Sequence, residues 1–533
     1  MVIAGSITGG LEVRLDSSTA IEEIKVGTFV SISGKQLRFF GTVTDVKLKN
    51  TDPNLELTPP NVSNPYVAEV ISGTNTYGTI TVEPSLTLGD DSFSQLDGPE
   101  TVKTVPSHFS RVSTASELDI QLVFGKEDQQ HFWIGNPMDM EAKLHLNMAE
   151  FVKRSNGVFG RSGTGKTFLT RLLLVGILQS QAASNLVFDM HNEYGWKGSS
   201  ESNQDVKGLK QLFSSKVAVF SLDDQSSKRR GLNPDYVVRI GYEEIEPEDV
   251  EALQETLGYS DVAAEAAYNL KEALGSQNWL GKFLALSRED VVELAGKINV
   301  HPSSLNSLLN RLSRLKRFDF MDHQRGHDSV GEILQYLNKG MHVVLEFGRY
   351  GSDLTAYILV ANLLTRRIRD RYEKMTEQAL GDQTKSPRPL VITIEEAHKF
   401  LNKDVASKTS FGPIAREMRK YNVTLLVVDQ RPSGIDEEVM SQLATKVTYA
   451  LGNDKDIEAV LAGQRGGKNL RSVIASLGSK QQALAFGDAL PMPVLFNTRE
   501  YGSRDSYREF GFKDGDELKI QKEKDVEELF GTQ

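Results

Sequence analysis

Residues 160–167 read Gly-Arg-Ser-Gly-Thr-Gly-Lys-Thr, a spacing that suits the binding of a nucleoside triphosphate. The glycines allow backbone N–H groups to surround phosphate oxygens, and the N-terminus of a following helix adds positive potential. In this pattern Lys166 reaches the β- and γ-phosphates and the Thr167 hydroxyl binds Mg²⁺. The residues expected at the nucleotide are Gly160, Arg161, Ser162, Gly163, Thr164, Gly165, Lys166, Thr167 and Phe168. The sequence therefore predicts an ATP or GTP site.

A second chemical element is the acidic pair Glu395-Glu396, which follows the apolar run 390–394. One carboxylate at the end of a buried strand can support the Mg²⁺ shell, and the next can deprotonate the attacking water. We assign Glu395 to the metal and Glu396 to the general base. Glu395 stands where Asp is more common among phosphate-loop NTPases, and its extra methylene favours contact with the metal through water. A solvent-exposed strand end is the alternative interpretation of the pair.

Three further sets of polar residues could act at a nucleotide, either in the same subunit or in a neighbouring one. Gln430 ends the next apolar run and could sense the γ-phosphate or hold the water, with a polar strand cap as the alternative. Arg154 and the basic residues Arg416, Arg419 and Lys420 could be supplied to a neighbouring subunit's nucleotide, or could form surface ion pairs. Asp189, His191 and Glu193 resemble a metal cluster, but an acidic strand end facing the nucleotide is the preferred interpretation.

The elements that must position these residues follow a change of pattern near residue 126. Residues 1–125 contain short alternating segments separated by Pro, Asn and Gly, which predict a small β-barrel or sandwich. Strands are expected there at 11–15, 30–32, 37–46, 66–71 and 77–82.

Residues 126–243 and 323–501 alternate apolar strands with helices, which predicts a doubly wound α/β domain. Its parallel strands are expected at 157–159, 186–188, 217–220, 343–347, 390–394 and 425–428. Residues 244–322 read as a helical insertion, and residues 502–533 as a charged C-terminal arm. The basic stripe formed by Arg311, Arg314, Lys316 and Arg317 indicates a solvated helix face or, alternatively, a surface facing DNA.

Composition limits the classes of protein that remain. A chain of 533 residues exceeds one compact core. The absence of cysteine excludes disulfides, thiolate zinc sites and iron–sulfur clusters, and fits a cytoplasmic protein. A net charge of −11 argues against broad coating with nucleic acid, although a basic channel inside an assembly stays compatible with it. We expect no membrane span and no secretion signal.

Taken together, these motifs resemble the HerA family of hexameric DNA translocases, in the larger group that also holds FtsK. Segments 26–30 and 40–46 look like the N-terminal β-barrel of that family, which is shared with rotary ATP synthases. The motifs that match family signatures, in the family's order, are those at 189–194, 395–398, 419–421 and 430–432. Asn192 and Asn422 stand where the family usually has glycine, and Met418 replaces the glycine before Arg419-Lys420.

The resemblance implies a RecA-like ATPase core and a ring of six subunits that hydrolyses ATP at its interfaces. Such rings pump double-stranded DNA and pair with NurA-type nucleases in end resection, while relatives pair with other effector enzymes in phage defence. Arg154, twelve residues before Lys166, and Arg419 match the family's trans-acting arginines.

The resulting expectation is an ATP- and Mg²⁺-dependent homohexameric DNA translocase or helicase. Basic loops at 228–230 and 465–468 are candidates for DNA contact, with exposed loops of no function as the alternative. The rival hypothesis is a nucleotide-gated ring scaffold that activates a partner enzyme with little translocation. A conjugation or secretion ATPase is a nearer variant that lacks support from a membrane segment.

Overall fold

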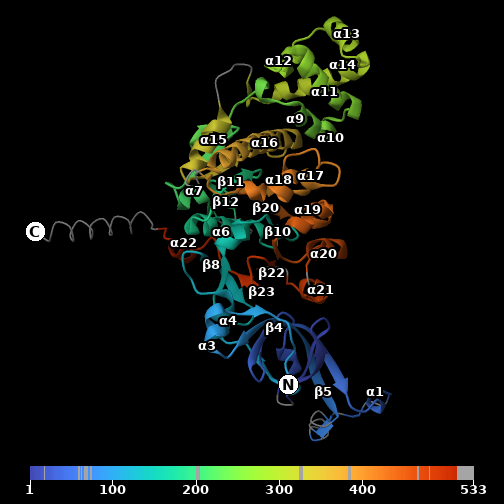
Figure 1. Ribbon diagram of the computed structural model, residues 1–533, viewed down its shortest axis with the longest axis vertical. Helices are drawn as coiled ribbons and strands as arrows, with labels where there is room; N and C mark the ends of the chain where they lie inside the picture. Colours follow the sequence, from blue (N-terminus) through green and yellow to red (C-terminus); the bar gives the residue numbers. More distant parts are fainter. Residues whose placement is uncertain are drawn as a thin grey trace, which may run out of the picture. The chain divides into compact units, whose positions relative to one another are not determined.

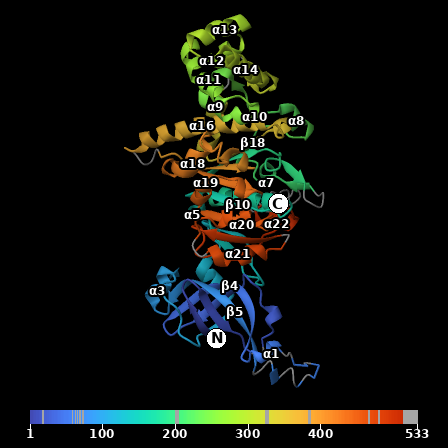
Figure 2. The same cartoon turned by 90° about the vertical axis from the view of Figure 1, so that its right-hand side faces the viewer.

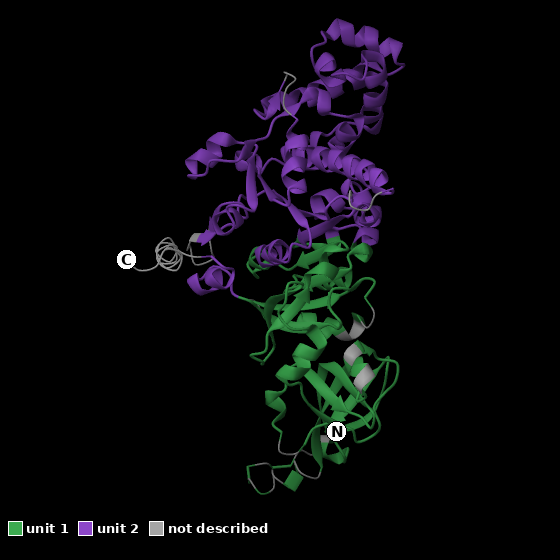
Figure 3. Ribbon diagram, turned by 60° about the vertical axis from the view of Figure 1, so that its left-hand side comes forward, with its two compact units in different colours: residues 1–169, 429–433, 440–499 green, residues 170–428, 434–439, 500–533 purple. Residues whose placement is uncertain are grey.

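The computed structural model describes residues 1–512, except 17–18, 58–59, 62, 65, 67–69, 72–74, 200–204, 323–327, 382–385, 465–466 and 479–480. The chain forms two compact units (Figure 3). Unit 1 contains residues 1–169, 429–433 and 440–499, and unit 2 contains residues 170–428, 434–439 and 500–533. Most of the predicted C-terminal arm, residues 513–533, lies outside the described residues.

The N-terminal part of unit 1 is an antiparallel sheet in the order β1-β2-β5-β4-β3-β7, with β6 paired to β5. The alternating apolar residues of its strands form one core, to which Val13, Ile32, Val43 and Val82 contribute. Its strands are β1 (Val2–Ser6), β2 (Gly10–Arg14), β3 (Phe29–Ser33), β4 (Leu37–Asn50), β5 (Thr76–Gly89), β6 (Glu100–Thr101) and β7 (Arg111–Thr114).

The two ends of this sheet approach each other at Val2. Its N–H donates to the Ser110 carbonyl at 3.0 Å, and its carbonyl accepts from the Phe109 N–H at 2.8 Å. The predicted small barrel stays a prediction, because the pairing order leaves β1 and β7 as the two edges. The strand predicted at 66–71 is wrong for the residues described there, Tyr66, Val70 and Ile71, which are helical. Tyr66 and Val70 are also mostly exposed, so no sheet face buries their apolar side chains.

The rest of unit 1 holds the strand before the phosphate loop. Strand β10 (Asn156–Phe159) is parallel to β21 (Thr445–Thr448). Antiparallel pairing then continues from β21 through β22 (Gln482–Gly487), β23 (Val494–Thr498), β8 (His131–Pro137) and β9 (Leu144–Asn147). Helices α20 (Asp454–Leu461) and α21 (Gly467–Ala475) lie between β21 and β22 in the chain (Figure 1).

Unit 2 is built on a parallel sheet in the order β15-β14-β18-β11-β19-β20. Its strands are β11 (Ser184–Asp189), β14 (Val217–Ser221), β15 (Tyr236–Val237), β18 (His342–Glu346), β19 (Leu390–Glu395) and β20 (Val423–Asp429), whose last residue belongs to unit 1. The longer strands are buried throughout, as expected for a parallel sheet covered on both faces. The predicted α/β fold is confirmed, and all six predicted parallel strands are present.

Residues 247–312 are helical, and they lie between the paired strands β16 (Ile240–Gly241) and β17 (Met321–Asp322). The helices are α9 (Pro247–Ala252), α10 (Gln254–Leu257), α11 (Asp261–Leu274), α12 (Trp279–Leu284), α13 (Arg288–Lys297) and α14 (Pro302–Leu312), followed by the 3₁₀ helix η3 (Ser313–Arg317). Apolar residues at helical spacing, such as Ala263, Ala267 and Leu270 of α11, form their shared core.

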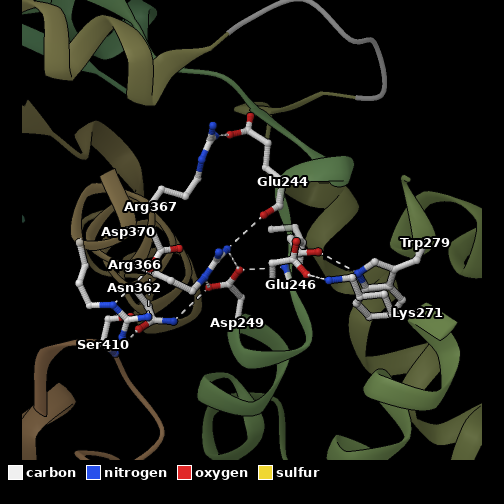
Figure 4. Close-up of polar contacts among 12 residues, drawn as sticks. Glu244, Glu246, Asp249, Lys271, Trp279, Asn362, Arg366, Arg367, Asp370 and Ser410 are labelled. Carbon is white, nitrogen blue, oxygen red and sulfur yellow. Dashed lines mark hydrogen bonds and ion pairs between the residues drawn. The ribbon is translucent and has the colours of Figure 1, made fainter. Parts of the chain in front are cut away.

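A buried polar cluster joins these helices to the long helix α16 (Leu354–Ala379), which contacts α9 and α10 (Figure 2). The Asp249 carboxylate accepts hydrogen bonds from Asn362 Nδ2 at 3.1 Å and Arg366 Nη2 at 2.6 Å (Figure 4). Asn362 Oδ1 accepts in turn from the Ser410 N–H at 2.8 Å. We refer to Asp249, Asn362, Arg366 and Ser410 as the insertion anchor.

One detail of the sequence-based organisation changes. Residues 228–230 do not form a loop: Lys228 and Arg229 lie on helix α8 (Asp224–Arg229), and Arg230 pairs with the buried Glu346. Of the other candidate for DNA contact, 465–468, the first two residues lie outside the described residues. In the basic stripe, Lys316 donates to the Leu284 carbonyl and Arg317 pairs with Asp353. No helix within the described part of the chain is both long and apolar enough to span a membrane.

Candidate functional site

The phosphate loop of unit 1 lies between β10, which ends at Phe159, and helix α6 (Lys166–Ser180). Gly163 and Gly165 both have positive φ angles, in a region that L-residues with a Cβ rarely adopt. The loop therefore has the strand–turn–helix context that the motif requires, and glycine is needed at these two positions.

Hydrogen bonds hold this loop in place from both of its sides. The Arg161 N–H donates to the Ala450 carbonyl at 3.0 Å, just after β21, and the Gly160 N–H donates to the Asp429 carbonyl at 3.3 Å. Within the loop, Thr164 Oγ1 and Lys166 Nζ both donate to the Arg161 carbonyl, at 2.8 and 2.9 Å. The loop is thus closed on itself, with its lysine folded over the backbone.

The bond to Asp429 brings Gln430 to the start of the phosphate loop. Asp429 is 1% exposed, and its side chain accepts from the Arg431 N–H at 2.6 Å, which turns the chain directly after Gln430. Gln430 is therefore the residue between two fixed backbone points. This placement fits the predicted role beside a γ-phosphate, which itself stays a prediction.

In unit 2, acidic side chains end three neighbouring strands, β18, β11 and β19. Asp189 is in register with Glu346, and Glu395 follows on the next strand. All three side chains are buried. Because the carboxyl ends of parallel strands meet at one sheet edge, this edge brings three carboxyl groups together. Sequence reasoning missed Glu346, although an acid inside the apolar run 343–347 was a visible signal.

Burial controls the protonation of two of these acids. It raises the pKa of Glu395 to about 8, while a hydrogen bond from Tyr194 acts in the opposite direction. It likewise raises the pKa of Glu346 to about 7, and the Arg230 guanidinium opposes this shift. A cation at this edge would offset the desolvation cost of both carboxylates.

Glu395 is held by two tyrosines. The Tyr194 hydroxyl donates to Glu395 Oε1 at 2.6 Å, and the Tyr357 hydroxyl donates to the Glu395 main-chain carbonyl at 3.2 Å. Glu395 Oε2 is buried and has no hydrogen-bond partner in the structure as described. Tyr194 ends the motif at 189–194, but no local pattern indicates a role for its hydroxyl.

Glu396 has a backbone conformation that is unusual for its residue type. Its φ angle is positive, in the left-handed region. Such a conformation costs an L-residue about 1–3 kcal/mol and is concentrated at functional sites. Its side chain is 22% exposed, with Oε2 3.7 Å from His398 Nδ1. Glu395 is buried and Glu396 is partly exposed, so the adjacent carboxylates occupy different environments.

Asp189 has a structural task. Its carboxylate accepts the backbone N–H groups of Glu193 and Tyr194, both at 2.8 Å, and of Gly195 at 3.2 Å. These bonds close the loop 189–195 and occupy both carboxylate oxygens. His191 lies within this loop and is exposed. The arrangement favours the acidic strand end over a metal cluster formed by Asp189, His191 and Glu193.

The departures from the family pattern have simple backbone explanations. Asn192 and Asn422 both have positive φ angles, and asparagine tolerates the left-handed region better than other L-residues with a side chain. Asn192 also exchanges two hydrogen bonds with the backbone of Gly348. Met418 has a right-handed helical backbone and is buried, so its position does not require glycine.

The candidate trans-acting arginines are partly exposed. Arg154 Nη1 lies 2.8 Å from Asp488 Oδ2, within unit 1, and its side chain is 46% exposed. Arg419 and Lys420 are exposed on the 3₁₀ helix η6 (Met418–Tyr421). Arg416 pairs with Glu438 at 3.2 Å. Exposure leaves Arg154 and Arg419 able to reach another molecule, whereas Arg416 is engaged within its own unit.

The residues present fit Mg²⁺. The donor set that the sequence predicts, the Thr167 hydroxyl and the Glu395 carboxylate, consists of the oxygen ligands that this cation prefers. Glu395 Oε2 is a buried polar atom whose hydrogen-bonding capacity is unused by the described residues. Mg²⁺ is commonly held by one or two carboxylates together with substrate phosphates, so a larger acidic cluster is not required.

Comparison with known proteins finds a family model that matches the central part of the chain. Residues 132–368 match the family model described as the central domain of helicase HerA. The DNA double-strand break repair helicase HerA of Pyrococcus furiosus is 24% identical over 436 residues, which cover 76% of each chain. Its namesake from Sulfolobus acidocaldarius is 24% identical over 420 residues, covering 77% of this chain and 76% of that protein.

Solved structures also match a large part of the chain, at low sequence identity. VirB4 of Thermoanaerobacter pseudethanolicus has a TM-score of 0.43 at 12% identity, covering 70% of this chain and 98% of that one. The plasmid coupling protein TrwB in complex with ADP and Mg²⁺ has a TM-score of 0.43 at 13% identity, covering 72% and 97%.

Proposed function

We propose that this chain is an ATP-dependent translocase or helicase of double-stranded DNA, because residues 132–368 match the central domain of helicase HerA and most of the chain is similar to HerA helicases. The observation that carries the proposal is the phosphate loop at 160–167, held between β10 and α6 with Gln430 at its start. The curated relatives are named for DNA double-strand break repair, which supports DNA as the substrate.

In the proposed reaction, Lys166 and the loop N–H groups would bind the triphosphate of ATP, and Thr167 and Glu395 would hold Mg²⁺, which would supply positive charge that neutralises the phosphates. Glu396 orients the attacking water and accepts its proton, and Gln430 senses the γ-phosphate. The strained backbone of Glu396 and its partial exposure support a role separate from that of the buried Glu395.

The proposed assembly is a homohexamer in which Arg154 and Arg419 reach the nucleotide of the neighbouring subunit. A trans arginine stabilises the charge that develops during phosphoryl transfer and accelerates it by about 10³ to 10⁵. Their exposure supports this role. The proposed partner is a NurA-type nuclease or a defence effector enzyme, and contacts to DNA are expected to go mainly to phosphates and to weaken with salt.

The test is the ATPase rate of the wild type and of Glu396→Gln, with and without linear duplex DNA. We expect duplex DNA to stimulate the wild type, and the variant to bind ATP without turning it over. Glu438→Gln, which alters an exposed acid paired with Arg416, is the matched control and should hydrolyse ATP as the wild type does. Activity that ignores DNA but responds to an added effector enzyme would favour the ring scaffold instead.

A further inference from the structure

We propose that Tyr194 is a positioning residue for the nucleotide reaction: its hydroxyl orients the Glu395 carboxylate so that Oε2 is the oxygen offered to Mg²⁺. The inference rests on the proposed function, which assigns Glu395 to the metal. It adds a residue that acts on the metal through Glu395, without touching the nucleotide.

The contact that carries the inference lies inside the core of unit 2. The Tyr194 hydroxyl donates to Glu395 Oε1 at 2.6 Å, and the two residues are 0% and 6% exposed. The last torsion of a glutamate is soft, so a carboxylate without a partner samples many orientations. A hydrogen bond to one oxygen selects one orientation and leaves the other oxygen, Oε2, for a ligand. Oε2 is buried and unpartnered within the described structure.

Tyr194 is itself fixed at three points, which a positioning residue requires. Its N–H donates to Asp189 Oδ2 at 2.8 Å, and its hydroxyl is bound to Glu395. The Arg171 guanidinium lies 5.9 Å from the centre of its ring. Arg171 is part of α6, the helix that begins with Lys166 and Thr167. Within unit 2, Tyr194 therefore contacts both the carboxylate at the end of β19 and the Arg171 side chain of α6.

Tyr357 provides a matched comparison on the same residue. Its hydroxyl donates to the main-chain carbonyl of Glu395 at 3.2 Å, and not to the carboxylate. Its ring packs edge-on against Phe347 and Phe400 at 4.9 and 4.8 Å, so it is as deeply buried as Tyr194. Removing either hydroxyl deletes one buried hydrogen bond, but only the Tyr194 change frees the carboxylate.

The experiment measures the affinity for ATP by titration calorimetry with Mg²⁺ and with EDTA, in full-length wild type, Tyr194→Phe and Tyr357→Phe. The ratio of the two affinities is the Mg²⁺ gain. Loss of a residue that orients a metal ligand typically costs about 10- to 100-fold in metal affinity or activity, so we expect a gain at least about tenfold smaller in Tyr194→Phe. Affinity in EDTA should stay unchanged in both variants, and Tyr357→Phe should keep the wild-type gain.

A second pair of variants tests whether Tyr194 acts through Glu395. In a Glu395→Gln background, adding Tyr194→Phe should change the Mg²⁺ gain by less than about twofold, because the group that Tyr194 orients is already altered. Melting temperatures measured without nucleotide separate the change in Mg²⁺ gain from a general loss of stability. Both tyrosine variants should lose a similar amount of stability, because each lacks one buried hydrogen bond.

An unchanged Mg²⁺ gain in Tyr194→Phe, or equal losses in both tyrosine variants, would overturn the inference. The inference would also be overturned if adding Tyr194→Phe to Glu395→Gln lowered the Mg²⁺ gain as much as Tyr194→Phe lowers it in the wild type. The proposed function fails by a different result, namely a wild type that binds ATP with a normal Mg²⁺ gain but neither hydrolyses it nor responds to DNA. In that case the gain still decides the role of Tyr194.

Discussion

The Arg154 guanidinium lies 2.8 Å from the Asp488 carboxylate of the same chain, on the strand-β10 side of the phosphate loop. Both side chains are about half exposed. An ion pair of this kind contributes about 0–1 kcal/mol to stability. The pair is therefore weak enough to open, so that Arg154 can engage another molecule.

The first prediction separates this ion pair from a trans-acting role. Arg154→Ala should assemble like the wild type but hydrolyse ATP roughly 10³-fold more slowly, because the neighbouring nucleotide loses its arginine. Asp488→Ala, the matched control, should retain hydrolysis. ATPase rates and the mass of the assembly by light scattering check both variants. Equal losses in the two variants would assign Arg154 to the ion pair.

The second prediction concerns Asn192, which has a left-handed backbone and stands where the related family usually has glycine. Asn192→Gly should lose the two bonds to Gly348, at about 1 kcal/mol each, and lower the Tm by a few degrees. Asn192→Ala should lower the Tm further, because a left-handed alanine costs about 1–2 kcal/mol more. Thermal unfolding checks this prediction: the Tm should fall from the wild type to Asn192→Gly and again to Asn192→Ala. An Asn192→Ala variant as stable as the wild type would contradict it.

The third prediction concerns the insertion anchor. Asp249→Ala leaves Arg366 buried without its carboxylate and should cost about 3–5 kcal/mol. Because this charge pair joins α9 to α16, limited proteolysis should cut residues 247–312 sooner in the variant. The control is Glu293→Ala in the exposed pair with Lys297, which should leave the free energy of unfolding nearly unchanged. If residues 247–312 were cut in Asp249→Ala at the same rate as in the wild type, the anchor would not be what holds the insertion.

The fourth prediction is a pH effect from His342 at the start of β18. Burial lowers the pKa of this imidazole to about 3, and its Nδ1 accepts the Asn185 N–H at 3.1 Å. The unfolded chain binds a proton near pH 6.5 that the folded chain resists, so stability falls as pH drops from 6.5 toward 3. The loss is about 1.4 kcal/mol per pH unit over that window.

The measurement compares Tm between pH 7.5 and pH 5.5 in the wild type and in His342→Asn. Buried Glu346 and Glu395 act in the opposite direction, because their raised pKa values favour the folded state at lower pH. The difference between the two proteins isolates His342, and the variant should lose less stability on acidification. The same pH response in both proteins would contradict the assignment.

Much of the fold was predictable from local pattern. Apolar runs bounded by turns predicted the strands β10, β11, β14, β18, β19 and β20, because strands buried on both faces must be apolar throughout. The glycines of the phosphate loop have the positive φ angles that their motif implies. The strand predicted at 66–71 failed because alternation alone does not bury a segment, and Tyr66 and Val70 stay exposed.

Other features depended on partners that are distant in the sequence. The expected basic loop at 228–230 is a helix whose Arg230 is drawn to Glu346, 116 residues away. Likewise, 201 residues separate Tyr194 from Glu395, and no local pattern relates a tyrosine after β11 to a glutamate at the end of β19. Sequence spacing reports contacts within a helix or strand, whereas these pairs arise from the order of strands in the sheet.

The amino-acid sequence by itself determined the phosphate loop, the acidic pair and the parallel strands before them, because each is encoded by consecutive residues. Only the tertiary structure decided which carboxylates are buried and what holds them. Glu395 is bound to Tyr194, Glu346 to Arg230 and Asp189 to its own loop, whereas Glu396 has a left-handed backbone and is partly exposed. Protonation and orientation depend on burial and on neighbours in space, which the folded chain alone supplies.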